Sequence, residues 1–168
     1  MLKVDLALLK RERRVSIDAR IPPDHAMWLG LGARLEGPVE VDVEAQRAGE
    51  DVVVRGRVGG IVTEGCRRCL RPVRAPFDDE VTWLYRAGVS EEEAEAAEVY
   101  PLARGRELDL AAAVRESVIL VAPGYVLCEE GCRGLCPTCG ANRNETMCEC
   151  GASAGDERWA VLRRLRSD

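Results

Sequence analysis

Cysteine thiols are the side chains of this chain whose number and spacing point to chemistry. Five of them lie in "CRGLCPTCGANRNETMCEC", residues 132–150. Cys128 lies just before that stretch, and Cys66 and Cys69 form a distant Cys-x-x-Cys pair in "CRRCL". Thiolates at this spacing can bind one metal ion when the chain turns tightly between them. Eight cysteines suffice for two sites with four ligands each.

The order of the cysteines predicts how they divide between two structural Zn²⁺ sites, since Zn²⁺ in such sites takes four tetrahedral ligands. The shortest loops group one set within the tail: Cys136, Cys139, Cys148 and Cys150. The second set then combines two distant segments: Cys66, Cys69, Cys128 and Cys132. A pairing of Cys66 and Cys69 with Cys136 and Cys139 stays open at this point.

A redox dithiol is the competing interpretation of Cys66 and Cys69, because basic neighbours lower a thiol pKa. Redox motifs of this spacing normally begin a helix, whereas this pair is expected between strands, so metal binding is favoured. The single histidine, His25, lies far from every cysteine and is interpreted as a surface or packing residue. Walker, GxSxG and HExxH signatures are missing from the sequence, so we predict that the protein is not an enzyme.

The segments that must position the thiols are predicted to be mainly strands. Strict alternation in "PVEVDVEA", residues 38–45, predicts a half-buried strand, and the runs 52–62 and 79–87 predict two more. Together they form an antiparallel meander with the first Cys pair between its second and third strands. Earlier strands are expected at 3–9 and 13–21.

One principal helix is predicted after the meander. Apolar residues recur at helical spacing through 110–121, with Asp109 as the expected N-cap and Pro123 as a stop. The predicted fold class is α+β: an antiparallel β meander packed by one principal helix, with a C-terminal cysteine-rich zinc-binding segment.

The domain organisation follows from changes in composition. Residues 1–127 are predicted to form the sheet-and-helix domain, with an acidic flexible insertion, a loop or marginal helix, at about 88–100. Residues 128–151 form the zinc segment, and 152–168 a short amphipathic helix. Charges follow a very short apolar run at the start, so no secretory signal is recognised and a cytoplasmic location without membrane association is expected.

The charge balance restricts the partners. A formal net charge of −5 argues against generic, charge-driven nucleic-acid binding. Arginines near the cysteines are nonetheless candidate contacts for RNA or another partner: Arg67, Arg68, Arg71 and Arg133. They can equally offset the −2 charge of each Zn²⁺ site, and two such sites take the net charge from −5 to about −9. The basic run at 10–14 is interpreted as a solvated face.

Three motifs together resemble the YceD family, the large-ribosomal-RNA-subunit accumulation proteins of bacteria and plastids. They are "CRRCLRPV", "LDLAAAVRESVILVAP" and "CEEGCRGLCPTCGANRNETMCEC", and the resemblance spans roughly residues 35–150. It implies a non-enzymatic ribosome-biogenesis factor needed for normal levels of large-subunit 23S rRNA. The implied partner is that rRNA, a pre-ribosomal particle or a basic ribosomal protein, and no small-molecule substrate is evident. A thiol-disulfide or zinc-dependent redox protein using Cys66 and Cys69 is the alternative.

Overall fold

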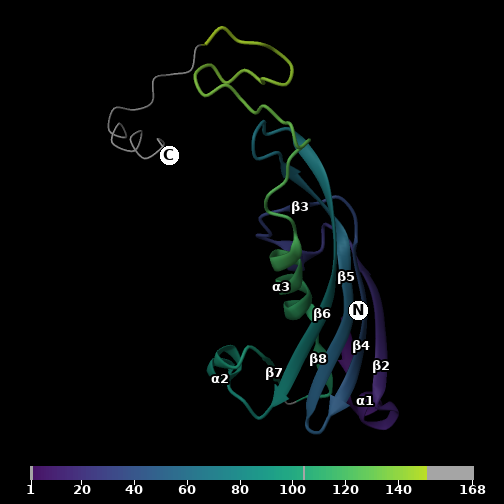
Figure 1. The fold of residues 1–168 in the computed structure, drawn as a ribbon. Helices are drawn as coiled ribbons and strands as arrows, with labels where there is room; N and C mark the ends of the chain where they lie inside the picture. Colours follow the sequence, from purple (N-terminus) through teal and green to yellow (C-terminus); the bar gives the residue numbers. More distant parts are fainter. Residues whose placement is uncertain (1, 104, 151–168) are drawn as a thin grey trace.

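The structure is a computed structural model that describes residues 2–103 and 105–150, so the helix predicted at 152–168 lies outside the described residues. The main sheet is long and twisted and has the strand order β2-β4-β5-β6-β7 (Figure 1). Its strands are β2 (Arg14–Ile21), β4 (Val39–Ala48), β5 (Asp51–Gly65), β6 (Pro72–Ala87) and β7 (Tyr100–Leu102). The short β3 (Arg34–Leu35) pairs with β5, and β1 (Lys3–Asp5) pairs with β8 (Glu107–Asp109) in a second sheet. The predicted α+β class and antiparallel meander are confirmed.

The core lies between one face of this sheet and helix α3 (Ala111–Val121). The predicted alternation is present in β4, where Val39, Val41 and Val43 are buried and the intervening acidic side chains face the opposite side. In α3, Val114 and Val118 are fully buried against this apolar face. Figure 1 shows α3 alongside the sheet. Burial of these branched side chains provides the driving force for the two-layer arrangement.

Polar contacts fix the position of α3. The indole Nε1 of Trp83 in β6 donates to Ser117 Oγ at 3.0 Å. Arg115 donates to the carbonyl of Met27, which lies within the 3₁₀ turn η1 (Ala26–Trp28), and to that of Leu29, which follows the turn. Asp109 Oδ1 accepts from Ala111 N at 2.9 Å, but the N-cap is Leu110, one residue after the predicted position, because Asp109 still pairs with Lys3 in the second sheet.

The strand predicted at 3–9 is wrong in its second half. Only Lys3–Asp5 is extended, and α1 spans Leu6–Glu12. Asp5 caps this helix by accepting from the N–H groups of Ala7 and Leu8 at 2.7 and 3.1 Å. The segment after the cap consists of strong helix formers, whose preference outweighs the weak alternation.

The acidic segment predicted as a loop or marginal helix contains α2 (Glu91–Ala96). Ser90 and Glu93 form a reciprocal capping box at its start. The chain then returns as β7, which runs parallel to the end of β6, and Tyr100 stacks on Tyr85 with ring centroids 5.1 Å apart. In the described parts of the chain, no helix is long and apolar enough to cross a bilayer.

Candidate metal centres

The first cysteine cluster joins the tip of the β5–β6 hairpin to the segment after α3. Cys66 and Cys69 lie in the turn between β5 and β6, and Cys128 and Cys132 follow α3. All four sulfurs lie within 4.8 Å of one another; Cys66 Sγ is 3.8 Å from Cys132 Sγ, and Cys69 Sγ is 3.6 Å from Cys128 Sγ. This contact crosses the predicted boundary between residues 127 and 128. The segment 128–150, here called the tail, therefore packs against the β5–β6 turn of the sheet domain.

The second cluster is local in sequence. Its members are Cys136, Cys139, Cys148 and Cys150, whose sulfurs also lie within 4.8 Å of one another. The structure therefore groups the eight cysteines in the two sets that their spacing predicted. It does not bring Cys66 and Cys69 together with Cys136 and Cys139 in one set.

The sulfur separations fit tetrahedral metal coordination. Four ligands about 2.3 Å from a central ion stand about 3.8 Å apart, close to the 3.6 and 3.8 Å found in the first cluster. A disulfide needs sulfurs about 2.05 Å apart, and all eight cysteines are free thiols. Both sets of thiols could each hold one metal ion.

The two clusters share the same turn geometry. In the first, Cys66 N donates to Arg71 O at 2.8 Å and Leu70 N donates to Cys66 O at 2.9 Å. In the second, Cys136 N donates to Ala141 O at 2.8 Å and Gly140 N to Cys136 O at 2.9 Å. Each turn directs backbone N–H groups at the sulfur of its first cysteine. These donors stabilise the negative charge of a thiolate ligand.

These N–H groups change the acidity of the leading thiols. Burial raises the pKa of Cys66, but the N–H groups of Cys69 and Arg68 outweigh it and bring the pKa to about 6. The N–H groups of Cys139 and Thr138 lower the pKa of Cys136 to about 6. The lowered pKa favours the thiolate at Cys66 and at Cys136, and the thiolate is the form that a metal ion binds.

Comparison with known proteins assigns the chain to a family. The family described as "Large ribosomal RNA subunit accumulation protein YceD" matches residues 54–166. The chain belongs to the YceD family. The matched region includes β6, α3 and every cysteine of both clusters. No solved structure matches the chain.

Relatives of this YceD chain occur in plants and bacteria. The "Large ribosomal RNA subunit accumulation protein YCED homolog 1, chloroplastic" of Arabidopsis thaliana is 26% identical over 158 residues, covering 77% of this chain and 49% of that protein. The homologue of the same description from Zea mays is 26% identical over 148 residues, covering 71% and 50%. An uncharacterized protein of Mycobacterium bovis is 30% identical over 133 residues, covering 74% and 60%. This YceD chain spans about half the length of its plant relatives.

The candidate arginines of the YceD chain lie around the first cluster, and two of the four donate to backbone carbonyls of the chain. Arg67 donates through Nε and Nη2 to Gly124 O, with Nε at 2.7 Å. Arg68 Nη1 donates to the carbonyls of Glu130 and Cys132 at 3.2 and 3.0 Å. The side chains of Arg67 and Arg68 therefore hold the tail against the hairpin tip.

Arg71 and Arg133 have different surroundings in the YceD chain. The Cys128 thiol beside Arg71 raises the pKa of that guanidinium, so Arg71 is placed to offset thiolate charge. Arg133 is exposed, and its backbone N–H donates to Asn144 Oδ1 at 2.7 Å.

Asn144 is a further site residue that the sequence reasoning missed. Its Nδ2 donates to Cys132 Sγ at 3.3 Å, although Asn144 lies in the loop of the second cluster. Asn142 Oδ1 in turn accepts from Asn144 N and Nδ2 at 3.1 and 2.8 Å. Hydrogen bonds to ligand atoms orient them and tune their affinity. No motif marks such a residue, because its role depends on the loop bringing it back to the first cluster.

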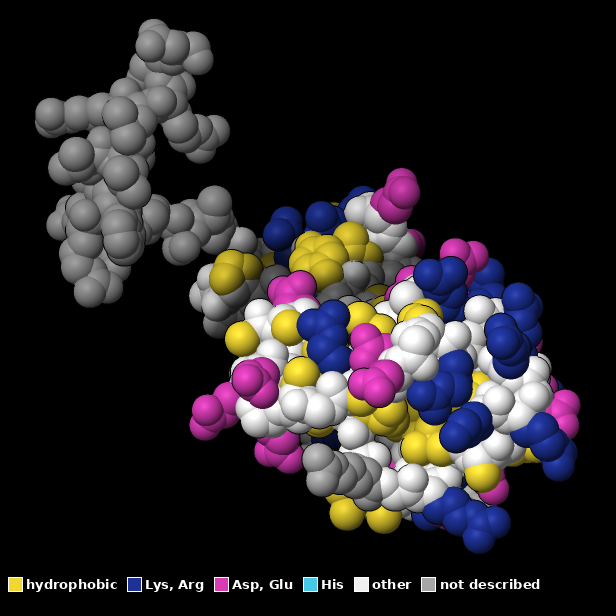
Figure 2. Space-filling view, turned by 90° about the horizontal axis from the view of Figure 1, so that it is seen from below, with side chains coloured by type: hydrophobic (Ala, Val, Ile, Leu, Met, Phe, Trp, Pro, Cys, Tyr) yellow, Lys and Arg dark blue, Asp and Glu magenta, His cyan; other side chains and the backbone are white. Residues whose placement is uncertain are grey.

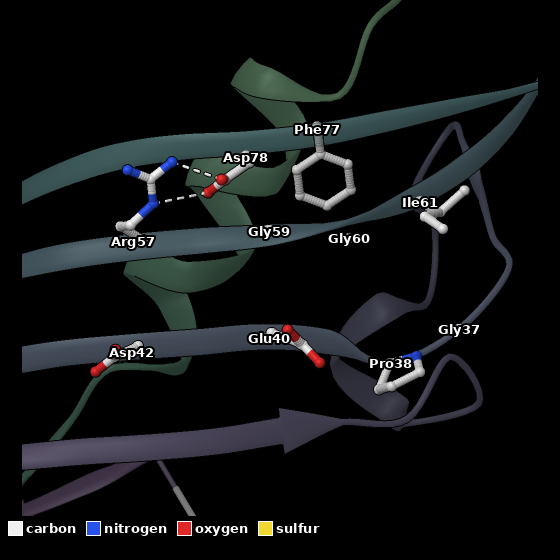
Figure 3. Close-up of a pocket in the computed structure, with 10 residues that line it drawn as sticks. All are labelled: Gly37, Pro38, Glu40, Asp42, Arg57, Gly59, Gly60, Ile61, Phe77 and Asp78. Carbon is white, nitrogen blue, oxygen red and sulfur yellow. Dashed lines mark hydrogen bonds and ion pairs between the residues drawn. The ribbon is translucent and has the colours of Figure 1, made fainter.

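A shallow hollow on the sheet face opposite α3 has a purely structural origin (Figure 3). It lies over Gly59 and Gly60, beside Pro38, Glu40 and the ion pair of Arg57 with Asp78. A Cβ on Gly60 would approach the ring carbon Cζ of Phe77 to 2.9 Å, so packing of Phe77 requires a glycine there. The hollow contains no cysteine, and we assign no function to it.

Leu70 occupies in the first turn the position that Gly140 occupies in the second. Its φ is 63°, against 74° for Gly140, so a bulky residue adopts the left-handed conformation. This conformation costs about 1–2 kcal/mol for a residue with a Cβ. The Leu70 side chain is 69% exposed, so packing recovers little of that cost.

Replacing Leu70 with glycine is expected to raise the free energy of unfolding by about 0.5–1 kcal/mol, because relief of backbone strain exceeds the entropic cost of glycine. Urea unfolding of the metal-loaded protein measures the change. Leu29→Gly is the matched control, since Leu29 is 78% exposed with an ordinary φ of −57°. That variant is expected to lose stability, and a Leu70→Gly variant that loses as much would show that the turn is unstrained.

Proposed function

We propose that this protein is a non-enzymatic ribosome-biogenesis factor that supports the accumulation of large-subunit 23S rRNA by binding that rRNA or a pre-ribosomal particle. The observation that carries the proposal is the family match over residues 54–166. That region contains the end of β5, the start of β6, helix α3 and both thiol clusters. Together these elements make the cysteine-rich end. The proposed location is the compartment of the rRNA, the cytoplasm in a bacterium.

We further propose that each cluster holds one structural Zn²⁺. Four thiolate donors at tetrahedral spacing are typical of structural zinc. Four protein ligands leave no open coordination position for a substrate or a reacting water, which supports a scaffolding role. The ion would fasten the tail of the chain to the hairpin tip and so set the surface presented to a partner.

Depletion of the protein tests the proposal directly. We expect the ratio of large- to small-subunit rRNA to fall in depleted cells and to recover on expression of this chain. The full chain is expected to co-sediment with particles that contain large-subunit rRNA precursors. An unchanged rRNA ratio, or migration of the protein only at the top of the gradient, would refute the proposal.

A basic ribosomal protein is the second candidate partner, favoured by the net charge of −5 and by the further negative charge of two thiolate-bound ions. Cross-linking in the gradient fractions distinguishes the two. Direct RNA binding yields protein–nucleotide adducts, whereas a ribosomal-protein chaperone yields protein–protein adducts only.

A further inference from the structure

The end of the sheet remote from the cysteine clusters carries a group of exposed cations, here called the basic pole: Lys10, Arg11, Arg13, Arg14 and Arg47. The first two lie in the last turn of α1, Arg13 is its C-cap, and Arg14 begins β2. Figure 2, which views the molecule from this end, shows Lys and Arg side chains gathered on the side of α1, β2 and β4. Asp and Glu side chains gather on the opposite side, where α2 lies.

Backbone pairing fixes the relative positions of the two segments that form the basic pole. Arg47 N donates to Arg13 O at 3.4 Å, and Arg14 lies opposite Gln46 in the β2–β4 register. The cations are therefore presented by an ordered helix end and two paired strands. Such a surface binds a charged partner without first losing chain entropy.

Few carboxylates neutralise the basic pole. Glu12 pairs with Arg11 at 2.9 Å and Glu44 pairs with Arg14 at 3.3 Å, and both are exposed pairs of the kind that contributes little. Within residues 2–103 and 105–150, Lys10 and Arg13 have no ion-pair partner. These two charges are free to meet an anionic ligand.

The cysteine-rich end is less suitable for binding phosphate than the basic pole, although arginines are frequent in its "CRRCLRPV" motif. Arg67 and Arg68 donate to backbone carbonyls, and Arg71 lies beside the Cys128 thiol. Each cluster of four thiolates with a divalent ion carries a charge of −2, which repels phosphate. A polyanion is therefore attracted to the opposite end of the molecule.

We propose that the basic pole is the surface that binds the phosphate backbone of large-subunit rRNA. This inference rests on the proposed function and deepens it by separating the RNA contact from the metal-bound end. Arginine and lysine side chains neutralise phosphates and release condensed counterions, which makes such binding strong at low salt and independent of base sequence. The acidic face of α2, with Glu91, Glu92 and Glu95 exposed, would repel the RNA and so limit its orientation.

The test compares two matched double variants of the full, metal-loaded chain. Lys10→Gln with Arg13→Gln removes two charges of the basic pole that have no ion-pair partner among the described residues. Arg133→Gln with Arg143→Gln removes two exposed charges at the cysteine-rich end. Binding to a transcribed large-subunit rRNA fragment is measured from ~0.05 to ~0.5 M salt.

The pole variant is expected to bind about 30-fold more weakly at ~0.1 M salt, with the slope of log K against log salt reduced by about 1.5, as the loss of two phosphate contacts requires. The cysteine-end variant is expected to match wild type in its affinity for the RNA and in its salt dependence. The single Lys10→Gln variant, at an exposed helical position, is expected to show about half of the slope change and guards against unfolding of the double variant.

Each other outcome is decisive. Unchanged binding by the pole variant, with or without a loss in the cysteine-end variant, overturns the inference and leaves the proposed function intact. A pole variant that keeps RNA affinity but no longer joins pre-ribosomal particles would show that the pole contacts an acidic protein, which also overturns it. Failure of wild type to bind RNA, together with an unchanged rRNA ratio on depletion, would refute the proposed function itself.

Discussion

Replacing Cys66 with serine is expected to reduce the metal content from two ions per chain to one and to free the tail from the β5–β6 hairpin. Cys66 is fully buried in the first cluster, and three remaining thiols leave the ion with an incomplete ligand set. Structural zinc contributes about 10–16 kcal/mol of apparent binding free energy in small peptides, so loss of the ion is expected to have a large effect. Metal analysis of the purified variant and proteolysis around residue 127 measure the two effects.

The core of the Cys66→Ser variant is expected to remain folded, because the buried residues between the sheet and α3 form a cluster separate from the one that contains Cys66. Cys148→Ser is the matched control: it should also lose one ion, but from the second cluster, so that the tail stays attached to the hairpin. Loss of both ions from either single variant would contradict two independent sites. A redox pair at Cys66 and Cys69 would react with a thiol reagent before any chelator is added, whereas metal-bound thiolates react only afterwards.

Replacing Gly56 with alanine is expected to lower the free energy of unfolding by about 3 kcal/mol. Gly56 lies in the centre of β5, where an added Cβ would stand 2.1 Å from Asp42 O and 2.6 Å from Val43 Cα on β4. Both neighbours are backbone atoms of a central strand, so the overlap can be relieved only by separating β4 from β5. Urea unfolding with a two-state fit gives the value.

Gly37→Ala is the control for the Gly56 substitution, since a Cβ at Gly37 meets no atom within 4 Å and its φ is not in the left-handed region. That variant is expected to stay within about 0.5 kcal/mol of wild type. Equal stability of the two variants would mean that β4 and β5 are not in close contact at this point.

The strands were predictable where one face of the sheet is buried. In β4 the alternation of valine with acidic residues specifies both the conformation and the buried face, and the structure confirms it. The predicted strand at 79–87 omits the N-terminal half of β6, which begins at Pro72 and includes Pro76. Those prolines are tolerated because β6 pairs with β7 only at residues 85–87, so the earlier half of β6 is an edge on that side.

The division of the cysteines was predictable because close spacing restricts which thiols can meet. The hydrogen-bond partners of the neighbouring arginines were not predictable. Arg67 and Arg68 carry a basic signal in the sequence, but their donation to carbonyls after α3 depends on tertiary contacts. The left-handed conformation of Leu70 could not be predicted, because a leucine rarely adopts it. The equivalent position in the "CPTCG" turn is Gly140, which adopts the same conformation.

The first cluster also sets an order of events during translation. Its hairpin half, Cys66 and Cys69, emerges in the nascent chain well before Cys128 and Cys132, which follow α3. Until α3 has been made and has docked, the hairpin exposes only two thiols, too few to complete a tetrahedral shell. If the first cluster holds an ion as proposed, full occupancy marks a chain that has finished its tertiary assembly, and the ion content of a sample then reports its mature fraction.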